Sequence, residues 1–117
     1  MITVEFSKCF EIRMGSPYKT CNFHLAGEWV PDLEEGGWVA VQARSPDGRY
    51  LVLAKWDTAE NTPGFRVVLI DEEQKTVDVS QRIPGCCEFL EWQTDAIAWK
   101  AFPQSQGNIA IPFDNLA

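Results

Sequence analysis

The chain has 117 residues and a mass of 13.2 kDa, a length typical of one folded domain. Hydrophobic residues make up 45% and aromatic residues 12%, which supplies a core and excludes a chain that stays disordered. Seventeen acidic and ten scattered basic side chains give a net charge of −7, which disfavours nucleic acid as a partner. Such acidity keeps a small protein soluble or suits a basic protein partner.

The first residues carry no targeting signal, because Met1 to Phe6 has no basic segment, apolar run or small-residue cleavage site. No apolar run elsewhere approaches the length that spans a bilayer. We therefore expect a single domain over residues 1–117, located in the cytoplasm and not associated with a membrane.

Two strands open the chain. Apolar and polar residues alternate along Met1 to Arg13, which is the pattern of a half-buried strand. Gly15-Ser16-Pro17 predicts a turn, and Tyr18 to Leu25 predicts a second extended segment. The segment from Gly27 to Gly37 predicts a loop, in which Asp32 to Glu35 can form at most one helical turn.

The segment from Trp38 to Trp56 predicts a β-hairpin. Two apolar runs flank Ser45-Pro46-Asp47-Gly48-Arg49, in which Pro46 presets the dihedral angle φ for a turn and Gly48 accommodates a positive φ. The second run, Tyr50 to Trp56, is apolar on both faces. We expect it to be covered on both sides, or to lie in the middle of a sheet against another layer.

Further strands follow at short intervals. They are predicted at Phe65 to Ile70, Thr76 to Val79, Cys87 to Trp92 and Ala96 to Phe102. Ile109 to Phe113 predicts a short edge strand, because Pro112 cannot donate a backbone hydrogen bond to a neighbouring strand. About eight to ten strands with turns between them, and no helical apolar stripe, predict an antiparallel all-β domain.

Ser45 to Leu51, S-P-D-G-R-Y-L, resembles the turn between the inner strands of blades in TolB-type and WD40-like β-propellers. A weaker copy of this segment surrounds Asp95, which lies 48 positions after Asp47, close to the period of about 40–50 residues in propeller blades. The resemblance covers residues 38–102. Propellers typically close with about four to eight blades, and this chain has strands for about two.

A fragment of two blades must cover its inner faces. We therefore expect a two-layer antiparallel β-sandwich of propeller-blade-like sheets, with the N-terminal strands completing the second sheet. The alternative architecture is a partial β-propeller that is completed by oligomerisation.

The four cysteines are Cys9, Cys21, Cys86 and Cys87, and no two are spaced as C-x-x-C. Adjacent Cys86 and Cys87 point to opposite faces of a strand, which is poor geometry for a tetrahedral metal site. We expect reduced core thiols, with a Cys9–Cys21 bridge as the alternative in an oxidising compartment. His24 and Cys21 face opposite sides of a strand, so a catalytic pair is not expected.

Two acidic runs are candidates for binding a hard cation. They are Asp32, Glu34 and Glu35 in the first loop, and Asp71, Glu72 and Glu73 in a later turn. Neither run has the spacing of an EF-hand, and charged turns are usually solvated, so we expect no metal and no cofactor. A pair of carboxylates brought together by the fold would instead allow glycoside hydrolysis.

Trp29 and Trp38 bracket the acidic loop. If their rings are exposed beside Asp32, Glu34 and Glu35, they form an anchor patch for a protein partner, since aromatic residues dominate interface hot spots. The alternative is that both rings are edges of the core. These five residues are the candidate binding site.

The sequence contains no catalytic constellation. We therefore expect a non-enzymatic domain that acts through protein–protein contact and can self-associate as a homo-oligomer. One alternative is a small-molecule or carbohydrate binding module that uses Trp29, Trp38 or Trp99. A further alternative is a small hydrolase that uses carboxylates.

Overall fold

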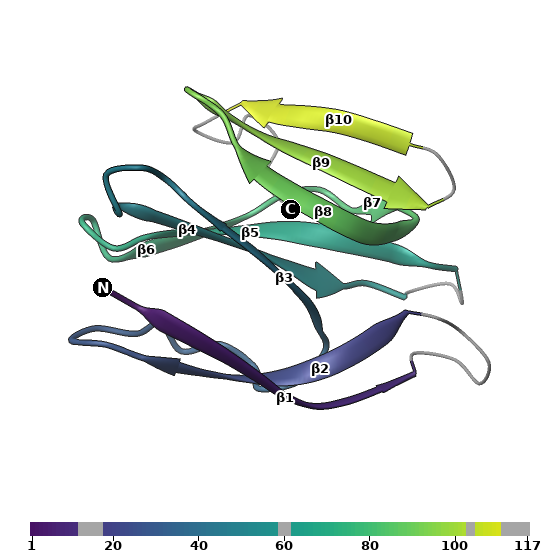
Figure 1. The fold of residues 1–117 in the computed structure, drawn as a ribbon, viewed down its shortest axis with the longest axis horizontal. Coiled ribbons are helices and arrows are strands. Elements are labelled where there is room, and N and C mark those ends of the chain that lie inside the picture. Colours follow the sequence, from purple (N-terminus) through teal and green to yellow (C-terminus); the bar gives the residue numbers. More distant parts are fainter. Residues whose placement is uncertain (12–17, 59–61, 103–104, 111–117) are drawn as a thin grey trace.

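The computed structural model describes residues 1–11, 18–58, 62–102 and 105–110, and this part of the chain contains strands and no helix (Figure 1). The strands are β1 (Thr3–Glu11), β2 (Lys19–Ala26), β3 (Trp38–Arg44), β4 (Tyr50–Trp56), β5 (Gly64–Asp71), β6 (Thr76–Val79), β7 (Ile83–Pro84), β8 (Cys86–Trp92), β9 (Ala96–Phe102) and β10 (Ser105–Ala110). The all-β prediction is confirmed. Within the described residues, no helix is long and apolar enough to cross a membrane.

The strands form two antiparallel sheets. The larger sheet has seven strands in the order β1-β2-β3-β4-β5-β6, with β7 paired to one end of β5. The smaller sheet has three strands in the order β10-β9-β8. The two sheets pack as a sandwich in which β8 lies against β3 and also contacts β4 and β5 (Figure 1). The predicted sandwich is therefore present.

The hairpin between β3 and β4 is closed by its own turn residues. The Ser45 amide donates to the Tyr50 carbonyl at 3.0 Å, and the Gly48 amide donates to the Ser45 carbonyl at 2.9 Å. Gly48 has a φ of +80°, which glycine adopts without a steric cost. Asp47 Oδ1 accepts the Ser45 hydroxyl at 2.7 Å and the Arg49 amide at 3.0 Å. This turn is specified locally, as the sequence predicted.

Strands β4 and β5 are buried on both faces, and each face belongs to a different apolar core. The sheet-to-sheet core contains Val39, Val52, Ala54, Trp56, Phe65, Val67, Leu69, Cys86, Cys87, Leu90, Ile97 and Ala101. The hairpin core contains Ile2, Phe23, Trp38, Leu51, Leu53, Val68 and Ile70. Alternate residues of β4 and β5 thus contact the smaller sheet on one side and the β1–β2 hairpin on the other, which confirms the cover expected from the sequence.

The β1–β2 hairpin reaches the second face of the central strands because it is joined to β3 by a single residue pair, Cys21 with Trp38. Beyond this pair the sheet turns, and β1 and β2 lie on the side of β3–β5 that faces away from the smaller sheet (Figure 1). The expectation that the N-terminal strands complete the second sheet is therefore wrong. They extend the larger sheet, and Ile2 and Phe23 cover the apolar side of β4 and β5.

Three local predictions differ from the structure or fall outside it. Strand β10 begins at Ser105, four residues before the edge strand predicted from Ile109, and its polar Gln106 and Asn108 occupy the exposed side of the strand. The helical turn considered for Asp32 to Glu35 is absent, and that segment is irregular. The turn predicted at residues 15–17 and the strand residues predicted at 111–113 lie outside the described residues.

The two cores can be tested with one matched pair of substitutions. Leu53→Ala opens a cavity in the hairpin core and Leu69→Ala opens one in the sheet-to-sheet core; the two side chains are 0% and 2% exposed. We expect each change to lower the free energy of unfolding by about 2–5 kcal/mol in urea titrations. Glu28→Ala on an exposed loop serves as the control, with an expected change within about 0.5 kcal/mol. If Leu53→Ala lowered the free energy of unfolding as little as the Glu28→Ala control does, the cover of β4 by the β1–β2 hairpin would be contradicted.

Candidate functional site

Trp38 is a core residue in the structure and not an exposed anchor. Its side chain is 1% exposed, and its ring stacks on Phe23 with centroids 4.1 Å apart. Its Nε1 donates to the Glu34 carbonyl at 2.8 Å, and Lys55 Nζ lies 5.3 Å from the ring centroid. Trp29 is half-buried against the same hairpin core. The anchor patch of two exposed tryptophans is therefore not formed, because both rings help to cover β4 and β5.

The carboxylates of the acidic loop do not form a shared site. Asp32 is exposed, and Glu34 forms an ion pair with Lys55 at 3.0 Å while its side chain stays 83% exposed. Glu35 contributes its backbone carbonyl, which accepts the Phe23 amide at 2.9 Å. Among the residues that the structure describes, no three His, Cys, Asp or Glu side chains gather so as to hold a metal ion.

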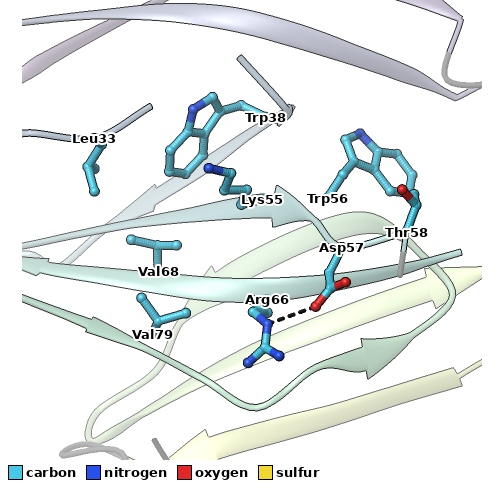
Figure 2. Close-up of a pocket in the computed structure, with 9 residues that line it drawn as sticks. All are labelled: Leu33, Trp38, Lys55, Trp56, Asp57, Thr58, Arg66, Val68 and Val79. Atoms are coloured by element: carbon cyan, nitrogen blue, oxygen red, sulfur yellow. Dashed lines mark hydrogen bonds and ion pairs between the residues drawn. The ribbon is translucent and has the colours of Figure 1, made fainter. Parts of the chain in front are cut away.

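A groove of about 390 Å³ lies beside Trp38 (Figure 2). It is lined by Leu33, Trp38, Lys55, Trp56, Asp57, Thr58, Arg66, Val68 and Val79. Arg66 Nε donates to Asp57 Oδ2 at 2.9 Å, which is the dashed line in Figure 2, and Lys55 is paired with Glu34. The Trp56 side chain is 8% exposed, with its Nε1 bonded to the Lys19 carbonyl at 3.0 Å. The groove has the size of a small-ligand pocket, but its charges are paired and its aromatic rings offer little open surface.

The second acidic run is bound to arginines. Asp71 accepts two hydrogen bonds from Arg49, at 3.0 Å and 2.9 Å, and this holds the pKa of the Asp71 carboxyl below its ordinary value. Glu72 accepts the Ile2 amide at 2.8 Å and forms an ion pair with Arg44. These carboxylates therefore connect the β5–β6 turn to the β3–β4 hairpin and to the N-terminus.

Asp57 has the same kind of role at the opposite ends of β4 and β5. It pairs with Arg66 at 2.9 Å and lies 3.7 Å from Arg82 Nε. For Asp71, the arginine pair lowers the pKa and stabilises the anion, which is a poor proton donor. Asp57, Asp71 and Glu72 are thus each held by an arginine. These carboxylates have structural partners and do not support the hydrolase alternative.

Cys9 and Cys21 form a disulfide between β1 and β2, with their Cα atoms 4.1 Å apart. Strand β1 has a bulge between Ser7 and Phe10, so two of its residues, one of them Cys9, lie opposite Cys21. The expectation of four reduced thiols is wrong for this pair, and the alternative bridge is formed. The Cys21 sulfur is therefore not available as a nucleophile.

Cys86 and Cys87 form no disulfide with a described residue, and both are buried. Burial raises the pKa of the Cys87 thiol to about 11, so the thiol is protonated and weakly reactive at neutral pH. His24 is exposed on β2, opposite Glu5 of β1. Neither Cys87 nor Cys21 is therefore activated as a nucleophile.

The outer face of the smaller sheet, which points away from the sheet-to-sheet core, carries exposed aromatic side chains. Phe89 on β8 is 40% exposed and Phe102 on β9 is 53% exposed. Lys100 Nζ lies 5.5 Å from the Phe89 ring centroid. A hollow of about 350 Å³ is present here, lined by Phe89, Glu91, Gln93, Ala98, Trp99, Lys100, Gln106, Gly107 and Asn108. This face was not predicted from the sequence, although Phe89 and Phe102 each lie next to a buried residue of their strand.

Tyr18 borders the outer face at one end. Its ring centroid lies 5.9 Å from that of Phe102, and its hydroxyl donates to Glu88 Oε2 at 3.0 Å. Partial burial and the Glu88 carboxylate raise the pKa of Tyr18 to about 12, so the hydroxyl remains a donor at neutral pH. The start of β2 is thus attached to the smaller sheet beside the exposed Phe102.

The two turns of the weak internal repeat meet at one end of the sandwich. Ser45-Pro46-Asp47 and Trp92-Gln93-Thr94 line a groove of about 620 Å³ together with Tyr50. The rings of Tyr50 and Trp92 stack with centroids 5.2 Å apart, and the Arg49 guanidinium lies 4.9 Å from the Tyr50 centroid. This stack joins β4 of the larger sheet to β8 of the smaller one, so we assign it a role in packing the two sheets.

The Arg49–Asp71 pair generates a pH-dependent prediction. Because the pKa of Asp71 is lowered in the folded state, the pair stabilises the fold fully above the ordinary value of 3.8, and this contribution is lost as the pH falls through the folded-state pKa. We expect Asp71→Asn to lower the free energy of unfolding in urea at pH 7, and this difference from the wild type to shrink at pH 3. Asp32→Asn on the exposed loop is the control. An Asp71→Asn deficit of equal size at both pH values would contradict the pairing.

Comparison with protein-family models, with curated proteins and with solved structures gives no match to this chain.

Proposed function

We propose that this chain is a non-enzymatic interaction module that binds a protein partner through the outer face of the smaller sheet. The observation that carries the proposal is the exposure of Phe89 and Phe102 on that face, 40% and 53% respectively. Large aromatic side chains gathered on an exposed surface are typical of sites where another protein binds.

The charge distribution supports the same surface. The hollow on the outer face is lined by one acidic and one basic side chain, Glu91 and Lys100, in a chain whose net charge is −7. The centres of protein interfaces are depleted in charged residues and enriched in aromatic ones. The hollow therefore has no excess of acidic side chains and suits a partner surface that need not be basic.

The hollow on this face gives the contact a defined shape. The Phe89 ring provides an apolar wall, and the amide side chains of Gln106 and Asn108 provide hydrogen-bond donors and acceptors. An apolar side chain of the partner fits such a hollow, with the amides bonding its backbone. Anchors of this kind, in a pocket with a polar rim, contribute most of the binding energy in protein complexes.

The proposal predicts a selective loss of binding. Affinity capture from cells that express the chain is compared for the wild type, Phe89→Ser, Phe102→Ser and the control Phe10→Ser, since Phe10 is 61% exposed on β1 in the larger sheet. For a protein captured by the wild type, we expect each outer-face variant to weaken the affinity about thirtyfold in titrations, equivalent to about 2 kcal/mol.

The control decides how the result is interpreted. Phe10→Ser is expected to retain the wild-type affinity, because the chemical change is the same but the surface differs. Equal loss in all three variants would show non-specific adhesion to exposed rings. Unchanged affinity in the Phe89 and Phe102 variants would contradict the outer face as the contact surface.

A further inference from the structure

The free edges of the two sheets are not alike. Edge strands expose unpaired backbone groups, and proteins usually protect them with charges, bulges or short length. Strand β1 has a bulge at which Lys8 adopts a φ of +49°, and it carries Glu5 and Glu11. Strand β6 has four residues and includes Asp78. Strand β8 has a bulge between Cys87 and Phe89 and carries two glutamates. These three edges are protected against pairing with another strand.

Strand β10 lacks every one of these devices. Its sequence from Ser105 to Ala110 contains no charged residue and no proline. It pairs with β9 through six consecutive residues without a register shift. The only charged side chain in β9 and β10 is Lys100, in a chain with 17 acidic and ten basic residues. The backbone groups on the far side of β10 have no strand partner among the described residues.

The apolar core is also incomplete at this edge. Ile109 of β10 and Trp99 of β9 pack against the sheet-to-sheet core but remain half-buried. The Trp99 ring lies over Gly107, where an added Cβ would come within 2.7 Å of Cζ2. The Trp99 indole N–H, unlike those of Trp38 and Trp56, has no hydrogen-bond partner among the described residues. Both the backbone and the core of this edge are thus able to accept another strand.

We propose that β10 pairs antiparallel with β10 of a second copy of this chain, which joins the two smaller sheets into one continuous sheet. A two-fold axis normal to the sheet through Gly107 places Gln106 opposite Asn108 of the second copy, and Ser105 opposite Ile109 of the second copy. Gln106 and Asn108 both lie on the exposed side of the strand, and Ser105 and Ile109 both lie on the core side. The two faces of the joined sheet therefore match.

The charge of the molecule favours a second copy at this edge over other places on the surface. Two chains of net charge −7 repel each other, and the repulsion is smallest where charged residues are absent. In the proposed pairing no charged side chain lies directly across the junction, and amide side chains face amide side chains. The inference does not require the outer face to bind a partner, although the joined sheet would carry two outer faces side by side.

The test is sedimentation equilibrium over a range of concentrations. For the wild type we expect a mass that rises from 13.2 kDa toward twice that value. The variant Gln106→Lys/Asn108→Lys is expected to remain at 13.2 kDa, because lysines on an edge strand repel their copies across the two-fold axis. Glu28→Lys on the β2–β3 loop changes the net charge equally and is expected to dimerise like the wild type.

Gln106→Glu/Asn108→Asp is a second variant of nearly unchanged side-chain volume, which serves if the lysine variant does not fold, and we expect it to be monomeric. A wild type that is monomeric at every concentration would overturn the proposal, as would a dimer that persists in either folded β10 variant. Phe102→Ser is expected to keep the dimer while losing the partner of the outer face. The failure of one proposal is therefore distinguishable from the failure of the other.

Discussion

The burial of β4 and β5 on both faces is the constraint on which the rest of the structure depends. Each strand places alternate apolar side chains on opposite sides, so a single layer packed against it would leave a full row of them in water. The smaller sheet covers one side and the β1–β2 hairpin covers the other. The bend after the Cys21–Trp38 pair follows from this need, since a flat seven-stranded sheet would leave the second side open.

Several charged residues of the molecule serve the same architecture. Arg49 and Arg44 connect the hairpin turn to the acidic turn and to Ile2, and Arg66 connects β5 to Asp57. The smaller sheet differs from these paired regions, because it exposes the Phe89 and Phe102 rings and has an edge strand, β10, without a charged residue. Such surfaces suit contact with proteins, which is why the functional proposals concern the smaller sheet.

The parts of the fold that depend on neighbouring residues were predictable from the sequence. The turn at Ser45 to Arg49 is closed by its own hydrogen bonds, and the doubly apolar pattern of Tyr50 to Trp56 required cover on both faces. The identity of the covering elements was not predictable, because it depends on where the sheet bends. The Arg49–Asp71 pair joins residues 22 positions apart, so the sequence showed an acidic run without its partner.

The exposed aromatic residues of the outer face could not be predicted from the sequence for a related reason. Phe89 and Phe102 each lie next to a buried residue, so β8 and β9 carry apolar side chains on both faces, as β4 does. The sequence does not tell which of these strands is covered on both faces and which on only one. Trp38 was a candidate for an exposed anchor, but its ring is buried. The local sequence does not separate the two cases, because a tryptophan beside an acidic loop can point outward or inward. The environment of Trp38 depends on Phe23 and Lys55, which belong to other strands.

Hydrogen exchange measured residue by residue tests the central claim most directly. If β4 and β5 are the doubly covered centre of the molecule, their amides exchange more slowly than those of β1, β2 and β8–β10, and only through global unfolding. The account is contradicted if the amides of β4 exchange as fast as those of β1, because a strand with one face open to water would lose protection by local opening.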